Sequence, residues 1–401
     1  MELTYSQKVD RSIVSSSVWQ MPWFIYSALI ATTSIITGLI WDISWHLSIG
    51  RDGLFSPPHL LIYLGGLLAG IGGGYLMIKT TFFGTQQEKE KAVWFWGFRS
   101  PLSALFLVWG ALAMLTSAPF DDWWHNAYGL DVEILSPPHT LLAMGMIMVQ
   151  LGSVIQLLSY QNTLKNYQAE NGLIAEKKVK LVQIMYVYTV GMLTAIIGTI
   201  LSEYLSPNHS HASIFYIVGG AAYPLFLISA GRASGLKMPI TTAALFYMAV
   251  QLFMIWLLPL FPATPKLGPV VNPITNYVPY EFPHLLIIPA VLLDLFRNKF
   301  EMKNDWLNAV CMGAIFFFSF LATQWNFGAF LLSDYAKNWM FIGDAVAYNW
   351  NPDWKYRNEF YPWLESGTAS LVKGLAWALV ITMLSTRIGL WWGNWMKAVK
   401  R

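Results

Sequence analysis

Charged residues are scarce in this chain of 401 residues, of which Asp, Glu, Lys and Arg make up 12%. Soluble domains carry about 25% charged residues, so the composition excludes an ordinary soluble protein. Several apolar runs instead reach the roughly 20 residues that cross a bilayer as a helix. The sequence therefore predicts an all-α, polytopic membrane helical bundle embedded in lipid.

Signatures of several other protein classes are also missing. The single cysteine, Cys311, lies within an apolar run, which excludes a disulfide framework and a thiolate metal site. No basic tract indicates nucleic acid as a partner, and the net charge is +3. No glycine-rich fingerprint predicts flavin or nicotinamide, so any reductant would come from a quinol or a soluble electron donor. The first apolar run lacks a small-residue cleavage site, and we expect it to be retained as a span.

The apolar runs predict about ten spans, at residues 19–41, 59–79, 101–118, 139–159, 181–202, 212–231, 239–261, 283–296, 306–325 and 368–388. Lys and Arg gather in the tails and in every second loop. The alternate loops carry Arg51, Lys266, Lys337, Lys355 and Arg357. By the positive-inside rule both termini are cytoplasmic. We expect an integral protein of a prokaryotic cytoplasmic membrane.

A motif occurs twice, at residues 42–61 and 121–141: D-x-x-W-H-x-x-x-G-x-D, followed by S-P-P-H-x-L. Weaker echoes follow at 201–213 (LSEYLSPNHSHAS) and 278–289 (VPYEFPHLLIIP). The histidines that follow the prolines, at positions 59, 139, 209 and 284, are 80, 70 and 75 residues apart. This period predicts four copies of a two-helix hairpin and a fifth, divergent pair.

These repeats divide the chain into four parts. Residues 1–18 form a cytoplasmic tail, 19–159 two hairpins with the full motif, and 181–296 two degenerate hairpins. Residues 306–401 form a C-terminal helical pair with a long extracytoplasmic loop, 326–367. That loop is aromatic, acidic and rich in Asn, which suits a cap over a site or a docking surface for a partner.

The motif places metal-binding side chains together at the extracytoplasmic face. Asp42 and His46 are four residues apart, so on a helix they share one face. The prolines at 57 and 58 fit the first turn of the next helix, which brings His59 to the same depth. The second copy repeats this set as Asp121, His125 and His139. Two histidines and one carboxylate with open positions form a known metal-binding set.

Other polar residues of the motif and its echoes are candidate additional ligands or groups that orient a ligand: Arg51, Asp52, Asp122, Asp131, Glu203, His209, His211, Glu281 and His284. A lone histidine at a helix end is more simply explained by a hydrogen bond to a loop carbonyl. The recurrence of the whole set favours metal binding. The third and fourth copies have no histidine four residues after a carboxylate, so we expect them to be structural.

The first copy, Asp42-x3-His46-x12-His59 with Arg51-Asp52 between the histidines, resembles the metal-site segment of the C subunit of particulate methane and ammonia monooxygenases. In that family the three residues bind copper near the extracytoplasmic side, and the complex oxidises methane, ammonia or short hydrocarbons with dioxygen. The resemblance implies that Asp42, His46 and His59 are copper ligands. That subunit is shorter, and the second copy here has an extra loop residue and Leu130 in place of the arginine.

Several functions are compatible with this pattern. The first is a copper-dependent membrane monooxygenase, or one subunit of it, that acts on a small apolar substrate or ammonia. Its partners would be other membrane subunits and an electron donor. The alternative is a copper or zinc transporter or chaperone-like protein, although a transporter needs ligands along a path through the membrane and these lie at one face. A bis-histidine haem held by His59 and His139 and a purely structural role also stay open.

The donor set alone does not select the metal. Carboxylate and imidazole suit copper, iron and zinc, and two histidines with one carboxylate are typical of non-haem iron. If both copies bind, the sequence allows either one dinuclear site or two mononuclear sites.

Overall fold

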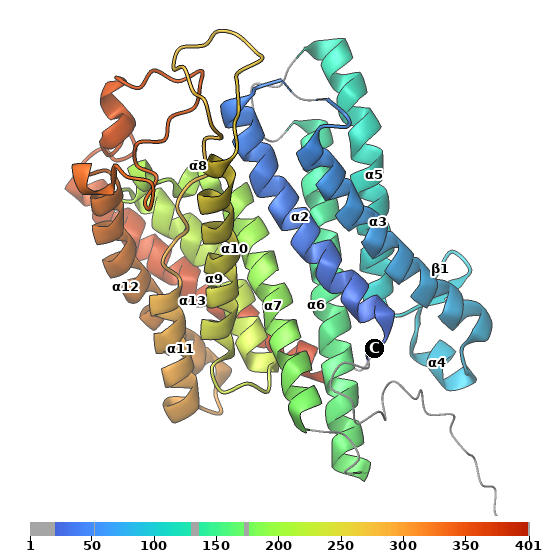
Figure 1. The fold of residues 1–401 in the computed structure, drawn as a ribbon. Coiled ribbons are helices and arrows are strands. Elements are labelled where there is room, and N and C mark those ends of the chain that lie inside the picture. Colours follow the sequence, from blue (N-terminus) through green and yellow to red (C-terminus); the bar gives the residue numbers. More distant parts are fainter. Residues whose placement is uncertain (1–20, 52, 130–135, 172–175, 400–401) are drawn as a thin grey trace, which may run out of the picture.

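The protein is a bundle of long helices joined by an irregular layer at one end (Figure 1). The structure is a computed structural model and describes residues 21–51, 53–129, 136–171 and 176–399. Within these residues, nine helices are long and apolar enough to cross a membrane. An all-α membrane bundle is therefore confirmed, whereas its sidedness stays a prediction. The predicted tail, 1–18, lies outside the described residues.

The first half of the chain forms two packed helical pairs. Its elements are α2 (Trp23–Ser48), α3 (Pro57–Ile78), a π turn (Lys79–Phe83), α4 (Gln86–Lys91), β1 (Val93–Phe95), β2 (Phe98–Ser100), α5 (Leu102–Tyr128) and α6 (Pro137–Asn171). Helix α2 packs on α3, α5 packs on α6, and α3 lies against α5. The two copies of the motif thus occupy equivalent turns, each joining the helices of one pair.

The helices of the second half pack in a different order from those of the first half. Its elements are α7 (Glu176–Ile200), α8 (Ser202–Leu205), a 3-10 turn (Pro207–His209), α9 (Ser213–Ala233), α10 (Pro239–Leu257) with a 3-10 turn (Leu258–Leu260), α11 (Ile287–Phe300), α12 (Asp305–Leu331), two 3-10 turns (Asp334–Ala336 and Lys355–Asn358) and α13 (Thr368–Ala398). Helix α9 packs most extensively on α13, and α7 packs on α6 and α10. The most extensive contact of this half therefore joins helices far apart in sequence, whereas α12 and α13 are neighbours in sequence that also pack on each other.

The eighth predicted span, 283–296, corresponds to a short helix and not to a full crossing. Helix α11 has 14 residues, which is about 21 Å and less than the roughly 30 Å of a hydrocarbon core. The chain before it, 261–286, is non-helical. Proline lacks a backbone N–H and disfavours a helical residue before it, so Pro279 and Pro283 explain why the helix does not begin earlier.

The irregular chain segments anchor the C-terminal end of α2. Ser44 Oγ donates to Val278 O, and Val278 N donates to Ser48 Oγ at 2.7 Å. The backbone N–H of Tyr348, from the long loop between α12 and α13, donates to Leu47 O at 3.1 Å. The last turns of α2, which carry the first copy of the motif, are therefore held by segments from the second half of the chain.

Candidate metal centre

The second copy of the motif lies where α5 ends and α6 begins. Asp121 and His125 are one turn apart near the end of α5, and His139 is the third residue of α6. The two helices approach closely at their glycines. A Cβ atom on Gly110 would lie 2.8 Å from Gly145 O, so only a glycine fits there without a shift. This close packing brings His139 to the level of Asp121.

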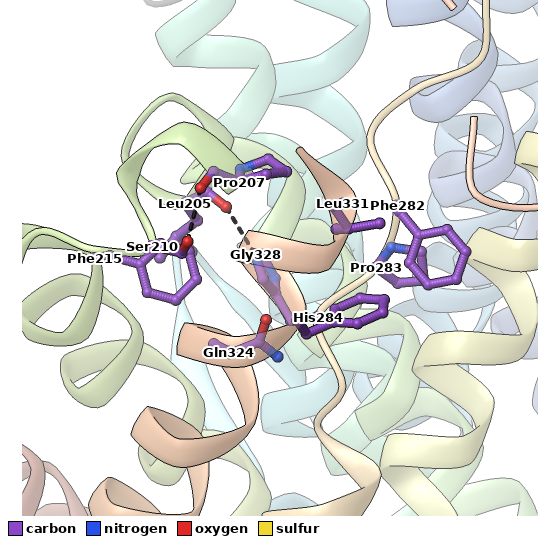
Figure 2. Close-up of a pocket in the computed structure, with 11 residues that line it drawn as sticks. Leu205, Pro207, Ser210, Phe215, Phe282, Pro283, His284, Gln324, Gly328 and Leu331 are labelled. Atoms are coloured by element: carbon purple, nitrogen blue, oxygen red, sulfur yellow. Dashed lines mark hydrogen bonds between the residues drawn. The ribbon is translucent and has the colours of Figure 1, made fainter. Parts of the chain in front are cut away.

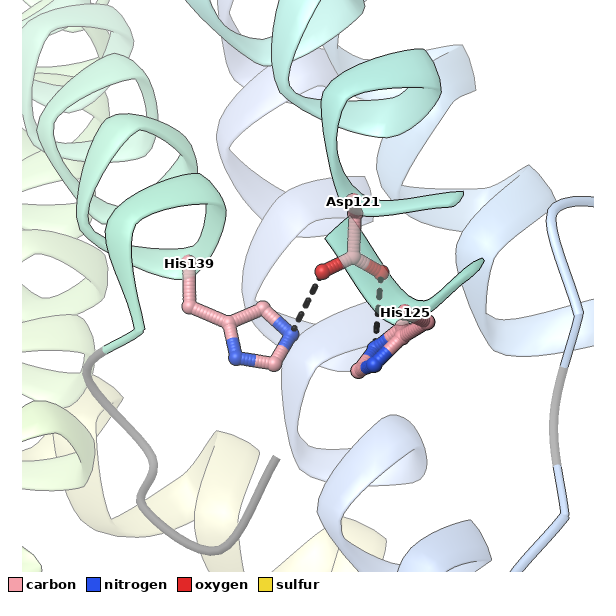
Figure 3. A group of neighbouring side chains, drawn as sticks. All are labelled: Asp121, His125 and His139. Atoms are coloured by element: carbon pink, nitrogen blue, oxygen red, sulfur yellow. Dashed lines mark ion pairs between the residues drawn. The ribbon is translucent and has the colours of Figure 1, made fainter. Parts of the chain in front are cut away.

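The three side chains converge on one point (Figure 3). Asp121 Oδ2 lies 3.5 Å from His125 Nε2, and Asp121 Oδ1 lies 3.4 Å from His139 Nε2. One donor atom from each residue fits within 4.8 Å of the others. Ligand atoms around one ion at about 2.1 Å are themselves about 3–3.5 Å apart. The group therefore needs little movement to hold a metal ion.

A loop carbonyl fixes the orientation of His125. Its Nδ1 lies 3.1 Å from Gly129 O, and since a carbonyl can only accept, Nδ1 carries the hydrogen. In the neutral ring Nε2 then presents a lone pair to the Asp121 carboxylate. Two acceptors that face each other require either a proton or a cation between them. Metal-bound histidines commonly donate their other N–H to a carbonyl in this way.

Gly129 is able to supply this carbonyl because it ends α5 with a positive φ of +89°, which residues with a Cβ rarely adopt. The equivalent glycine of the first copy, Gly50, has φ +79°. The glycine shared by the two copies is therefore explained by a helix end, where residues without a Cβ are favoured. The shared glycine is visible in the sequence motif, but the hydrogen bond from His125 to the Gly129 carbonyl, which sets the tautomer of that histidine, is visible only in the structure.

The first copy has the same pattern with the histidine roles exchanged. Asp42 Oδ1 lies 3.2 Å from His59 Nε2, and Asp42 Oδ2 lies 3.9 Å from His46 Nε2. Here it is His59 whose Nδ1 donates to a loop carbonyl, that of Gly53, at 3.0 Å. The His46 side chain is 46% exposed, compared with 15% for His59. Asp42 is thus shared by the two histidines, with His59 closer.

The remaining candidates of the two full copies lie around these groups. Asp122 is exposed, and its carboxylate and carbonyl oxygens accept from Asn126 Nδ2. Arg51 is exposed, and its carbonyl accepts from Trp45 Nε1 at 3.1 Å. Asp52 and Asp131 lie outside the described residues. Asp122 therefore points to the surface beside the centre and is not one of its three clustered groups.

The echo at 201–213 holds its histidines in contacts of another kind. His211 is stacked between Trp325 and Phe360, at ring distances of 3.9 and 3.5 Å, and its Nε2 donates to Trp325 O. His209 Nδ1 lies 2.6 Å from Ser206 Oγ. Burial lowers the pKa of both histidines because it disfavours the charged ring. Glu203 is exposed.

His284, in the fourth echo, is held by hydrogen bonds on both ring nitrogens. Its Nε2 donates to Leu205 O at 2.8 Å, and its Nδ1 accepts from Tyr223 at 2.9 Å. Figure 2 shows His284 beside Gln324 at a cavity of about 10 Å³, which has room for about one water molecule. Burial raises the pKa of the nearby Glu281 to about 7. In the described part of the chain, neither residue joins the clustered metal-type group.

Comparisons of the chain with protein-family models, with curated proteins and with solved structures gave no match. The resemblance of the first copy to a copper monooxygenase subunit therefore stays a prediction. What the chain holds is a membrane helical bundle with an Asp/His/His cluster that could bind a metal ion.

Proposed function

We propose that this chain is an integral membrane metalloprotein that binds one transition-metal ion through Asp121, His125 and His139. The observation that carries this proposal is the convergence of one carboxylate and two imidazoles within 4.8 Å. The hydrogen bond from His125 to Gly129 supports it, because it leaves Nε2 as the ligating atom.

The accessibility of the cluster favours a reactive site over a closed structural one. The side chains of Asp121, His125 and His139 are 22%, 24% and 34% exposed. Three protein ligands leave coordination positions open, as in catalytic metal sites, whereas structural sites are closed by four. A bound ion would supply these open positions to an exogenous ligand such as dioxygen.

Copper-dependent oxidation of a small apolar substrate or ammonia is the reaction that we propose for this centre. Its support is the resemblance of the first copy and the donor set, which also suits iron. Aromatic side chains beside the second copy, including Trp124 and Tyr128 with ring centroids 4.5 Å apart, would accept an apolar substrate at the membrane boundary. The first copy, Asp42 with His46 and His59, is a second candidate ion site.

The arrangement favours a metal ion over a haem held by His59 and His139. Each of these histidines directs Nε2 towards the aspartate of its own copy, at 3.2 Å for His59 and 3.4 Å for His139. A haem iron between them would require both rings to leave these aspartates. These contacts support an ion held within a copy of the motif over a haem held between the two copies.

The test is dioxygen consumption by the protein in lipid nanodiscs after loading with copper, iron or zinc. Ammonia and short hydrocarbons serve as substrates and a quinol as reductant. We expect substrate-dependent consumption with copper, lost in Asp121→Asn and kept in Asp122→Asn, which removes the same charge next to the cluster. If none of the three metals supports substrate-dependent dioxygen consumption, the proposed oxygenase activity is refuted. Metal flux into sealed vesicles would then indicate metal handling.

A further inference from the structure

A groove with a volume of about 390 Å³ opens where α2, α7 and α10 meet, and it shares no residue with the candidate metal centre. Binding pockets for small molecules typically have volumes of about 300–1,000 Å³. The groove is lined by Leu29, Ile30, Thr33, Met185, Tyr188 and Phe246, among others. Ile30 is 54% exposed on α2, a helix long and apolar enough to cross a membrane, so we expect this side of the bundle to face the bilayer. The groove is thus open to molecules dissolved in lipid (Figure 1 shows α2 and α7).

Two hydroxyl groups interrupt this apolar lining, and their hydrogens can be assigned. Thr33 Oγ1 donates to Leu29 O at 2.8 Å, which uses its one hydrogen. Thr33 Oγ1 and the Tyr188 hydroxyl are 2.5 Å apart, so the tyrosine must donate to the threonine. The Tyr188 hydroxyl hydrogen is therefore used in the bond to Thr33, and its oxygen is left in the groove lining as a hydrogen-bond acceptor.

The surroundings hold this acceptor in place at membrane depth. The Tyr188 ring packs edge-on against Phe246, with ring centroids 5.1 Å apart. Thr33 and Tyr188 lie near the middle of α2 and α7, each long enough to cross a membrane. Water is absent at this depth, so an acceptor there gains most from a donor that arrives with an apolar molecule.

We propose that the groove binds a membrane-dissolved apolar molecule through a hydroxyl group that donates to the Tyr188 oxygen. The aliphatic part of this molecule contacts Leu29, Ile30 and Met185. A lipid acyl chain fills the same space but offers no donor to Tyr188. The hydroxyl therefore distinguishes a specific ligand from a solvating lipid.

The experiment uses azioctanol, a photoactivatable octanol, with the full chain in nanodiscs and mass spectrometry of the labelled peptides. A diazirine-bearing octane without a hydroxyl is the matched probe. We expect azioctanol to label peptides of α2 and α7 in preference to the octane probe. Tyr188→Phe should reduce this labelling about three- to tenfold below saturation, the effect of losing one hydrogen bond.

Tyr75→Phe is the control variant, because Tyr75 is exposed on α3 and does not line the groove. It should label like the unsubstituted protein. Equal labelling by the two probes, or unchanged labelling of Tyr188→Phe, would show that the groove accepts any hydrocarbon chain and would overturn the proposal. Labelling confined to peptides outside α2, α7 and α10 would overturn it as well. None of these outcomes depends on metal binding.

Discussion

The substitution Asp121→Asn should remove most of the stability that a bound metal ion gives to this protein. The Asp121 carboxylate oxygens lie 3.5 Å from His125 Nε2 and 3.4 Å from His139 Nε2. An asparagine at this position has no negative charge and removes the carboxylate ligand that lies between the two histidines. Loss of an outer partner of a metal ligand costs about 10- to 100-fold in affinity, and loss of the ligand itself should cost at least this much.

The effect on stability follows from mass action. At a metal concentration about 100 times the dissociation constant, the ion stabilises the folded protein by about 2.7 kcal/mol. After a 100-fold loss of affinity the same concentration contributes about 0.4 kcal/mol. The assay is thermal unfolding in nanodiscs with and without copper, with Asp122→Asn as the control. A metal-induced shift in Asp121→Asn equal to that of the unsubstituted protein would refute the assignment.

Three further predictions concern the support of the site and the buried acid. Gly129→Ala should destabilise the protein by about 1–2 kcal/mol, because φ is +89°, and should weaken metal binding about tenfold. Gly74→Ala, in α3 with open space around its Cβ, should change neither; thermal unfolding checks the stability and isothermal titration with copper checks the binding. Gly110→Ala should lower the free energy of unfolding by about 1–3 kcal/mol, because the added Cβ pushes α5 away from α6. Gly74→Ala, whose Cβ would contact no other atom, should leave it unchanged in the same thermal unfolding experiment. Burial raises the pKa of Glu281 from 4.5 to about 7, so the stability that it contributes is full below about pH 4.5 and falls by about 3 kcal/mol as the pH rises through about 7. Glu281→Gln should remove this slope from unfolding curves measured across that range.

Much of the helical framework was predictable because a span is a local property of about 20 residues. The helices that carry the motif, α2, α3, α5 and α6, begin close to their predicted starts, but α2, α5 and α6 extend past the predicted ends, to Ser48, Tyr128 and Asn171. Helix geometry alone predicts that Asp121 and His125 share one face of a helix. The prolines that begin the next helix predict that His139 lies in its first turn, at the same depth. These features are encoded within about one or two turns of chain.

Features that depend on long-range packing were not predictable in this way. The eighth span has an apolar sequence, yet α11 is short. Besides the prolines at 279 and 283, the chain before it makes contacts with α2 and α8 that no local pattern predicts. The pairing of α9 with α13 joins segments far apart in sequence. The fixed tautomers of His59 and His125 depend on carbonyls whose direction is set by the folded turns.

The central claim is that the second copy of the motif binds a metal ion. Its most direct test is the metal content per chain of the purified protein in nanodiscs, measured by mass spectrometry after copper loading and dialysis, beside a His125→Ala/His139→Ala variant. The proposal predicts that the variant retains one ion per chain fewer than the unsubstituted protein while keeping its helical circular dichroism. Equal metal content in the two proteins, or no retained metal in either, would contradict it.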